Sequence, residues 1–154
     1  MQTFLPYSSF VDSAKCLDNK RLGKQRVEAK QIYLALSYGP EQRFIINGNT
    51  FVKKTPWYNH PAVKMWKGHE GSLLYYIHVV CTEWVHRGFK DSVLDWAKSV
   101  VSTPSDASFM DPAWNRNENL HAAHRSNLLR KNPEWYGKFG WTEPDNLPYV
   151  WPVV

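Results

Sequence analysis

A polar interruption of one helical face constrains this chain more than any other feature of its sequence. Residues 10–37 carry apolar side chains at the spacing of a core-facing helix: Phe10, Ala14, Leu17, Ile32 and Ala35. The middle of the same face holds polar residues instead: Arg21, Gln25 and Glu28, with Lys24 at its edge. Such groups cost roughly several kcal/mol each when they are buried without partners. This face must therefore either pair internally or open to a ligand.

Two interpretations of this polar run are open. Arg21 and Glu28 could form an internal ion pair that fixes helix packing, although a buried ion pair adds little net stability. Alternatively, the run forms the floor of a cleft that receives a polar ligand. Neighbouring Lys20, Lys24 and Arg26 supply more positive charge than one carboxylate can balance. We therefore favour the cleft, because polar groups in such positions tend to mark functional sites.

The chain is expected to fold as one all-α domain over residues 1–154. Its length and its hydrophobic content of 43% suffice for a single core. Pro6 and the polar residues after it predict an extended N-terminus. The tail that follows Asn132-Pro133 is rich in aromatic residues and proline and has no helical period. We expect this aromatic tail to wrap over the helices, because so many exposed rings would form a sticky patch.

Three main helices are predicted from apolar periodicity and from cap and proline signals. They cover residues 10–37, about 60–87 and about 111–131. Gly23 lies inside the first of them, which suggests close approach of another chain or of a ligand; simple tolerance of glycine is the alternative. Shorter elements are also predicted: a helix over residues 92–101, a hairpin that turns at Asn47-Gly48, and a polar loop over residues 103–108.

The charge distribution favours an anionic partner. The net charge is +5, and six Lys or Arg residues lie between positions 15 and 30. A second basic group lies in the last third of the chain: Arg116, Arg125, Arg130 and Lys131. Aromatic residues, including eight Trp, are interleaved with these charges. We expect double-stranded DNA as the partner and no membrane, because the chain has no long apolar run.

The cysteines and the first residues predict the compartment. Cys16 and Cys81 form no CxxC pattern and are expected to be small buried thiols in a reducing environment. The first ten residues lack a charged start and a sustained apolar run, so no signal peptide is expected. We expect a monomer in the cytoplasm, or in the host cytoplasm if the protein is viral.

Common catalytic motifs are absent from the sequence. It has no glycine-rich phosphate loop and no GxSxG elbow. His121 and His124 could share a metal with His60 or His69, but no carboxylate accompanies them in a metal-binding motif. We therefore expect no metal and no cofactor, and we favour phosphate contacts as the role of His121 and His124.

A carboxylate and an amine remain as candidate reacting groups. Glu28 on a half-buried face could act as a general acid or base. Glu70 is a second candidate, although pairing with His69 or Arg87 is favoured for it. An unprotonated amine can form a Schiff base, and the α-amino group has a pKa of ~7.7–8.0 against ~10.4 for lysine. Lys20 and Lys24 are possible substitutes.

Several motifs occur in a characteristic order. They are KRLGKQRVE at residues 20–28, HPAVKMW at residues 60–66, EWVHRGF at residues 83–89 and NPEWYGKFG at residues 132–140. In this order the chain resembles the bacteriophage pyrimidine-dimer DNA glycosylases, also called dimer-specific endonuclease V, and within them a divergent branch that begins MQTFLP. The resemblance implies a small all-α repair enzyme without metal or cofactor. Such an enzyme binds DNA on a basic concave face, kinks it and extrudes a base.

The same resemblance implies a mechanism, and the chain departs from it at two positions. In the family, an N-terminal α-amine attacks C1′ of the damaged nucleotide, a glutamate of the first helix assists, and β-elimination nicks the strand. The glutamate position, three residues before Arg26, is Gly23 here, and Glu28 is the expected replacement. The family nucleophile is a small residue exposed by removal of Met. Gln2 is bulky and disfavours that removal. Either Met1 therefore offers the amine, or the mechanism differs from that of the family.

The predicted function is a DNA glycosylase with abasic-site lyase activity that excises damaged pyrimidines through a Schiff base. The predicted catalytic residues are Met1, Gln2 and Glu28. The predicted DNA-binding residues are Lys20, Arg21, Lys24, Gln25, Arg26, His121, His124, Arg125, Lys131, Trp135 and Tyr136. For the last two, packing on the first helix is an equal alternative. The alternative functions are a glycosylase for another modified base, a non-catalytic DNA-structure-binding protein and, last, a metal-dependent hydrolase.

Overall fold

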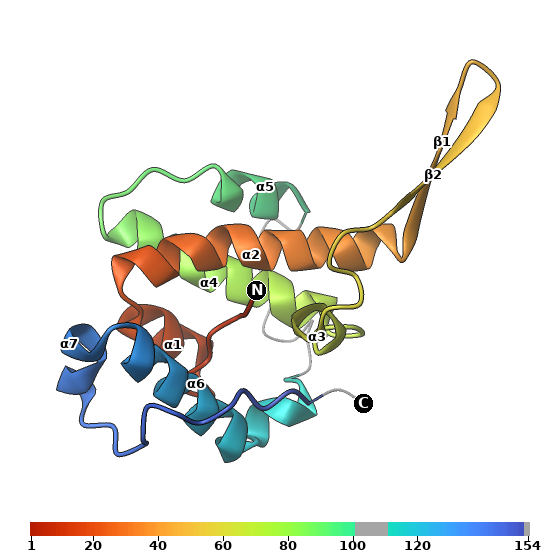
Figure 1. Cartoon of the computed structure of the whole chain (residues 1–154). Coiled ribbons are helices and arrows are strands. Elements are labelled where there is room, and N and C mark those ends of the chain that lie inside the picture. Colours follow the sequence, from red (N-terminus) through yellow and green to blue (C-terminus); the bar gives the residue numbers. More distant parts are fainter. Residues whose placement is uncertain (101–110, 153–154) are drawn as a thin grey trace.

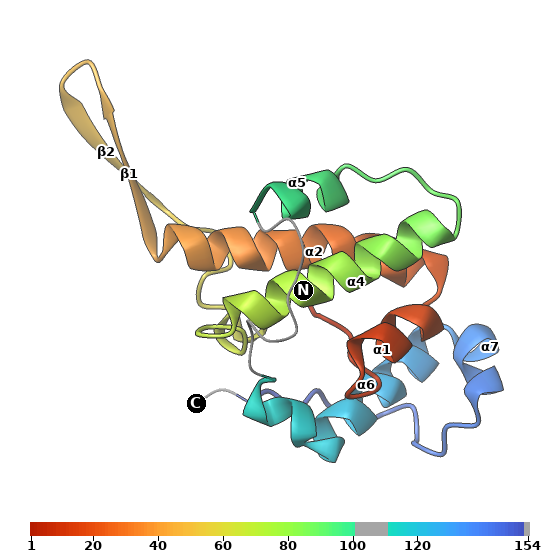
Figure 2. The ribbon, with the colours of Figure 1, turned by 180° about the vertical axis from the view of Figure 1, so that it is seen from behind.

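The structure is a computed structural model that describes residues 1–100 and 111–152. In that part of the chain it contains seven α-helices, two short 3-10 helices and one two-stranded sheet. The central pair is formed by α2 (Asn19–Tyr38) and α4 (Glu70–His86), which lie side by side (Figure 1). Four of the other α-helices flank this pair: α5 (Val93–Val100) on one side, and α1 (Phe10–Cys16), α6 (Glu118–Lys131) and α7 (Pro133–Tyr136) on the other (Figures 1 and 2). The fold is therefore mostly helical as predicted, but it has a small sheet, and the helices are more numerous than three.

The predicted first helix is in fact two helices. The chain is extended at Leu17 and Asp18, which separate α1 from α2. The Arg87 guanidinium donates to three carbonyl oxygens at the end of α1, those of Ala14, Lys15 and Leu17. The Tyr136 hydroxyl accepts from the Asp18 amide at 3.0 Å and donates to the Asp18 carboxylate. These two distant side chains satisfy the groups that a helix end leaves unpaired, and they stabilise the break.

The second predicted helix is also interrupted. Its first part is α3 (Pro61–Lys64), and the His60 side chain accepts a hydrogen bond from the Ala62 amide as the N-cap. Gly68 adopts φ 82° between α3 and α4, a conformation that favours glycine and ends the first part. Glu70, in the first turn of α4, accepts from the Gly68 amide at 3.2 Å.

The predicted third helix begins later than expected. The 3-10 helix η1 (Ala113–Arg116) precedes α6, and the Asn117 side chain caps α6 by accepting from the Asn119 amide. The Asn132-Pro133 signal is confirmed as the end of α6, and Asn132 also caps α7. A second 3-10 helix, η2 (Gly137–Phe139), follows α7.

The predicted hairpin is confirmed. It is formed by β1 (Glu41–Ile46) and β2 (Asn49–Lys54), which pair antiparallel. Asn47 and Gly48 connect the strands with φ of 51° and 78°. Two consecutive positive φ angles are typical of the type I′ turn, whose twist matches that of paired strands. The hairpin follows α2 directly and projects away from the helices (Figure 1).

The first residues of the chain run through the interior in extended conformation. Residues 2–6, which we call the N-terminal segment, are all buried. Side chains rather than another strand satisfy its backbone. The Phe4 amide donates to Gln25 Oε1 at 2.8 Å, and the Leu5 amide donates to His124 Nδ1 at 2.9 Å. The segment is therefore fixed by α2 and α6, which pack against it.

Side chains of the surrounding structure also bond to carbonyl oxygens and to one hydroxyl group of the N-terminal segment. The Tyr76 hydroxyl donates to the Phe4 carbonyl at 2.9 Å, and Arg125 donates to the Pro6 carbonyl at 2.7 Å. Trp66 Nε1 donates to the Thr3 hydroxyl at 3.0 Å. A buried backbone needs such partners, and here they come from three helices and the loop before α4.

The aromatic tail packs back onto the helices, as predicted. Tyr149 and Trp151 are partly buried against the core, and the Trp141 ring stacks on that of Tyr136 at a centroid distance of 5.6 Å. The predicted helix over residues 92–101 corresponds to α5. The predicted polar loop over residues 103–108 lies outside the described residues.

Two further expectations can be compared with the structure. Cys16 and Cys81 are free and buried, as expected, and burial raises the pKa of the Cys16 thiol to about 12. Over the described residues, every helix is too short or too polar to cross a lipid bilayer.

Candidate functional site

A polar cavity of about 430 Å³ lies where the chain begins. It is formed by the N-terminal half of α2, the first residues, the end of α6 and the tail. Its lining residues are Met1, Gln2, Phe4, Lys20, Arg21, Lys24, Gln25, Glu28, Lys131 and Tyr149. The polar run of the first predicted helix therefore does line an open hollow, and it does so beside the first residue of the chain.

Glu28 is the carboxylate closest to the chain start among the contacts of the described residues. The Gln2 amide donates to Glu28 Oε2 at 3.3 Å. The amide belongs to the peptide that joins Met1 to Gln2, so the carboxylate lies within one residue of the α-amine. Arg21, the alternative partner for Glu28, instead forms an ion pair with Asp18 at 3.0 Å. The interpretation of Arg21 and Glu28 as a mutual ion pair is therefore wrong.

His60 lies close enough to the N-terminal amine and to Glu28 for both charges to influence its pKa. Its pKa is lowered, first by burial and then by the positive charge of the N-terminal amine, while Glu28 opposes the shift. The Trp151 ring lies against the His60 ring at a centroid distance of 5.8 Å. A His with a lowered pKa is neutral at pH 7, so it adds no charge to this end of the cavity.

Gln25 connects α2 to the N-terminal segment. Its Oε1 accepts from the Phe4 amide and from the Tyr76 hydroxyl, each at 2.8 Å. Its Nε2 donates to the Gln2 carbonyl at 3.1 Å. Gln25 is 1% exposed, and both its amide atoms are used within the chain. The prediction that Gln25 binds DNA is therefore corrected: it positions the first residues.

The cavity carries an excess of positive charge. Lys20, Lys24 and Lys131 are exposed at its edge, and Arg21 is partly buried beside them. The pKa of Lys131 is lowered, first by partial burial and then by the charges of Arg21, Arg130 and Lys24, with Glu28 opposing. Like charges held this close without an equal number of carboxylates favour an anionic ligand.

His121 and His124 are interior residues and do not reach the surface. They are 2% and 1% exposed. His121 Nδ1 lies 2.6 Å from the Leu5 carbonyl oxygen, and His121 Nε2 lies 2.8 Å from that of Asn115. Burial, and then the charge of His121, lower the pKa of His124 to about 3. The predicted phosphate contacts are therefore wrong for both residues, which hold the N-terminal segment instead.

Tyr136 and Trp135 pack on the first helices, which was the alternative to DNA binding. Tyr136 is fully buried and bonds to Asp18, so its prediction as a DNA-binding residue is corrected. Trp135 is partly buried, and its Nε1 donates to the Cys16 carbonyl at 2.8 Å. Lys138 Nζ lies 3.5 Å from the centre of the Trp135 ring. Both aromatic residues lie outside the cavity lining.

Arg26 and Arg125 are engaged in ion pairs outside the cavity lining. Arg26 binds Asp91, and its guanidinium lies 4.4 Å from the centre of the Trp84 ring. Arg125 contacts two carboxylates, Glu118 and Glu143, in addition to the Pro6 carbonyl. Both arginines stabilise the fold in this structure.

The structure explains why a glycine occupies position 23. A side chain added there would begin 3.0 Å from the Trp84 ring. A close approach does occur at Gly23, but the approaching group is the Trp84 side chain of α4 rather than another chain or a ligand. Position 23 is the position of the glutamate implied by the family resemblance. Any larger residue there would displace the indole, whereas Glu28 is free to face the cavity.

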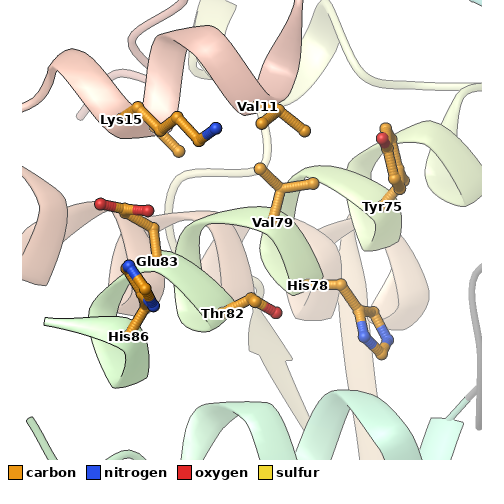
Figure 3. A pocket seen from close by; sticks show the side chains of 9 residues that line it. Val11, Lys15, Tyr75, His78, Val79, Thr82, Glu83 and His86 are labelled. Atoms are coloured by element: carbon orange, nitrogen blue, oxygen red, sulfur yellow. The ribbon is translucent and has the colours of Figure 1, made fainter. Parts of the chain in front are cut away.

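A second cavity, of about 470 Å³, lies between α1 and α4. Figure 3 shows Val11 and Val79 facing each other in its middle, with Lys15, Glu83 and His86 at one end. Glu83 is paired with Arg87 at 3.0 Å. This cavity has an apolar centre and lacks the basic cluster and the chain start, so it is not the candidate site. Among the described residues, no group of three or more His, Cys, Asp or Glu is placed to hold a metal ion.

The fold and cavity together define a small, mostly helical protein with a basic site for an anionic ligand. Residues 1–96 match the family described as pyrimidine dimer DNA glycosylase. This match covers more than half of the chain, so the chain belongs to the pyrimidine dimer DNA glycosylase family. The family is one of DNA repair glycosylases, and its substrate is DNA. No curated protein and no solved structure matches the chain.

Sequence reasoning missed three residues of the site and its surroundings. Phe4 and Tyr149 line the cavity, and His60 lies within range of its amine and carboxylate. Phe4 and Tyr149 come from segments without helical periodicity, so no spacing pattern pointed to them. His60 was considered in the sequence only as a helix cap or a possible metal ligand, not as a neighbour of the amine and Glu28. Its neighbourhood depends on the path of the tail, which brings Trp151 beside it.

Proposed function

We propose that this protein is a DNA glycosylase with abasic-site lyase activity that removes damaged pyrimidines through a Schiff base on its N-terminal amine. One observation carries the proposal. The Glu28 carboxylate lies 3.3 Å from the Gln2 amide nitrogen, inside a basic cavity that the first residue helps to line. A general acid or base next to an amine is the arrangement that Schiff-base chemistry on a sugar requires.

The proposed reaction begins with the α-amine. Its nitrogen forms a bond to C1′ of the damaged nucleotide, and the bond from C1′ to the base breaks, so the base leaves and takes up a proton. Loss of the amine proton and opening of the sugar ring give the imine. Removal of a C2′ proton then expels the 3′ phosphate, and water releases the enzyme. Glu28 is proposed to move protons at the ring oxygen and at C2′, because it is the carboxylate in the cavity lining.

Three amines can be distinguished as nucleophiles. The first is the α-amine of Met1. The second is that of Gln2, if Met1 is removed, because its nitrogen is the atom that already contacts Glu28. The third is a lysine of the cavity lining: Lys20 or Lys24, the substitutes that the sequence suggested, or Lys131, whose pKa is lowered. The buried N-terminal segment supports an α-amine, since eight bonds from side chains of the surrounding structure fix residues 2–6 at the cavity wall.

The basic residues at the cavity edge are proposed to bind the DNA backbone. Lys20, Lys24 and Lys131 are exposed, and Arg21 is oriented by Asp18. Phosphate contacts of this kind position a duplex without reading its sequence. The base must leave the stack for an amine to reach C1′, and a damaged base costs less to extrude.

Borohydride trapping tests the proposal. Wild-type protein is incubated with duplex DNA that carries a pyrimidine dimer or an abasic site, and borohydride reduces any imine to a stable adduct. We expect an adduct, and its mass together with peptide mapping identifies the attached residue as Met1, Gln2 or one of the cavity lysines. Absence of an adduct with both substrates would reject the lyase mechanism.

Two comparisons separate the remaining functions. A panel of duplexes with other modified bases distinguishes a dimer-specific enzyme from a glycosylase of the same build with another substrate. Wild-type protein that binds duplex DNA without giving product, together with a Glu28→Gln variant of equal affinity, would indicate a non-catalytic DNA-structure-binding protein. Both comparisons use the same trapping and binding assays.

A further inference from the structure

The β1–β2 hairpin is the most exposed apolar element of the described chain. All its residues except Gln42 are exposed, and the hairpin extends well beyond the helices (Figures 1 and 2). Ile45 is 77% exposed and Ile46 57%. Such apolar groups on an isolated hairpin are unfavourable in water, and a two-stranded hairpin is marginal by itself. The hairpin therefore has the character of a surface that contacts a partner.

The strand register shows which side chains share a face. Phe44 lies opposite Phe51, Arg43 opposite Val52, and Ile45 opposite Thr50. Opposed residues point to the same side of a hairpin, and the sides alternate along each strand. One face therefore carries the phenylalanine pair, the other carries Ile45, and Ile46 lies next to the turn. Each face therefore carries an isoleucine close to the Asn47-Gly48 turn, which suits insertion of this end rather than packing of one face on a flat surface.

The charge of the hairpin suits an anionic partner. It carries Arg43, Lys53 and Lys54 against the single carboxylate of Glu41. Glu41 lies 3.7 Å from Arg43 and opposite Lys54 in the strand register, so one carboxylate faces three basic residues and the hairpin keeps an excess of positive charge. A second copy of this chain would bring the same positive charge, which disfavours self-pairing of two hairpins. A nucleic-acid backbone is complementary to it.

A series of aromatic rings connects the hairpin to the cavity. Trp57, just after β2, lies 6.1 Å from the His60 ring, and His60 lies 5.8 Å from Trp151. Trp151 lies 5.6 Å from Tyr149, which lines the cavity. Trp57 is 58% exposed and adopts φ 66°, a strained conformation for a bulky residue. A ligand that reaches from the cavity to the hairpin would meet aromatic rings along this path.

We propose that the hairpin Glu41–Lys54 is a second DNA-contacting element, whose apolar tip enters the duplex next to the nucleotide held at the cavity. Ile45 and Ile46 act as a wedge at a base step, and Lys53 and Lys54 contact the flanking phosphates. Apolar side chains of DNA-bending proteins unstack a base step in this way. This inference rests on the proposed function, since it requires DNA at the cavity.

The first test removes the wedge without disturbing the helices. The variant Ile45→Ser/Ile46→Ser is compared with wild type for binding to a duplex that contains a reduced abasic-site analogue, with 2-aminopurine at the neighbouring steps. We expect affinity to fall by about tenfold or more, because serine buries less apolar surface against the bases. We also expect the fluorescence rise that reports unstacking to disappear, which a weaker attraction to phosphates alone would not cause.

A matched control uses an exposed apolar residue at the other end of the molecule. Val85, near the end of α4, is 44% exposed. Val85→Ser is expected to bind and unstack as the wild type does. Equal affinity and equal 2-aminopurine signals for the Ile45→Ser/Ile46→Ser variant and the wild type would overturn the proposal.

The second test concerns the hairpin lysines. Lys53→Gln/Lys54→Gln is expected to reduce the slope of log affinity against log salt by about 1 for each phosphate that a lysine no longer neutralises. The exposed Lys98 of α5 provides the control, and Lys98→Gln is expected to leave the slope unchanged. An unchanged slope for the hairpin variant would contradict its contact with phosphates.

The outcomes separate this inference from the proposed function. If the wild type gives no borohydride adduct, the proposed mechanism fails, and the hairpin is still tested by DNA affinity. If the wild type is trapped and the hairpin variants keep full affinity, only the inference fails. Sedimentation identifies the rival partner: a wild-type dimer that the Ile45→Ser/Ile46→Ser variant abolishes, with DNA affinity intact, would assign the hairpin to a second copy and overturn the proposal.

Discussion

The N-terminal segment and the β1–β2 hairpin are both extended backbone, but the rest of the chain treats them in opposite ways. Residues 2–6 are buried, and side chains of α2, α4 and α6 satisfy their amides and carbonyls. The hairpin is bonded strand to strand and is exposed on both faces. The N-terminal segment and the hairpin are therefore suited to different roles. The group proposed to react is held at one point, whereas the element proposed to contact the duplex remains accessible.

The largest expected effect concerns the N-terminal segment and Glu28, where the proposed reaction takes place. Glu28→Gln keeps the side-chain size and an acceptor for the Gln2 amide but removes the charge and the acid-base function. We expect single-turnover excision to fall by about 10²- to 10⁴-fold, with DNA affinity and stability near those of the wild type. Glu70→Gln is the control, because Glu70 lies outside the cavity lining and is expected to leave the rate unchanged.

The second prediction removes the support of the N-terminal segment. Gln25→Leu leaves the Phe4 amide and the Gln2 carbonyl without partners in the interior, and the Tyr76 hydroxyl keeps only the Phe4 carbonyl. Buried polar groups left unpaired cost about 1–3 kcal/mol each, so we expect a loss of about 3 kcal/mol or more in the free energy of unfolding. Urea denaturation measures this loss.

The hairpin offers a chemically identical substitution as a control. Gln42→Leu changes a residue of β1 and is expected to alter the free energy of unfolding by no more than about 0.5 kcal/mol. Equal losses for the two substitutions would contradict the view that residues 2–6 depend on the helices while the hairpin does not contribute to the core.

The third prediction uses pH to separate the two regions. The buried His124 accepts a hydrogen bond from Leu5, and its pKa is lowered from 6.5 to about 3. Between these values the unfolded chain binds the proton and the folded chain does not, so stability falls as the pH falls through this window. The slope from this residue is about 1.4 kcal/mol per pH unit. Thermal unfolding measured from pH 7 to pH 4 tests it.

A variant isolates the contribution of His124. His124→Asn keeps an acceptor for the Leu5 amide but cannot titrate, so we expect its stability to depend less steeply on pH. A slope as steep as that of the wild type would assign the acid sensitivity to other groups. The hairpin contains no His, so Lys53→Gln/Lys54→Gln is expected to retain the wild-type slope over the same window.

The smallest expected effect tests the independence of the hairpin. Ile45→Ser/Ile46→Ser is expected to change the free energy of unfolding by less than about 0.5 kcal/mol, because both side chains are already exposed. Denaturant unfolding checks this expectation beside the DNA-binding assays. A large loss of stability would mean that the hairpin packs on the helices in solution.

The sequence predicted those features whose physical cause is local. The polar run of Arg21, Gln25 and Glu28 follows from helical spacing, and the hairpin follows from the Asn47-Gly48 turn between two apolar runs. The break between α1 and α2 has no such local signal. It depends on Arg87 and Tyr136, which reach it from distant parts of the chain, and spacing within one helix does not reveal their positions.

The misassigned residues have a similar explanation. His121 and His124 lie on a basic helix, and their sequence context favoured contact with phosphate. In the structure they face Leu5, because the extended start of the chain passes between α2 and α6. Buried polar residues and exposed binding residues have the same amino-acid types, so a single sequence distinguishes them only when the path of every neighbouring segment is known.

The position of the first residue also has a practical consequence. A purification tag fused ahead of Met1 would have to leave through the cavity that Glu28 and Lys131 line, and it would convert the α-amine into an ordinary peptide bond. Under the proposed mechanism, a protein prepared in that form is expected to fold and to lack activity. Assays of the proposed activity should therefore use a tag at the other end of the chain, or a cleavage that frees the α-amine at the cavity.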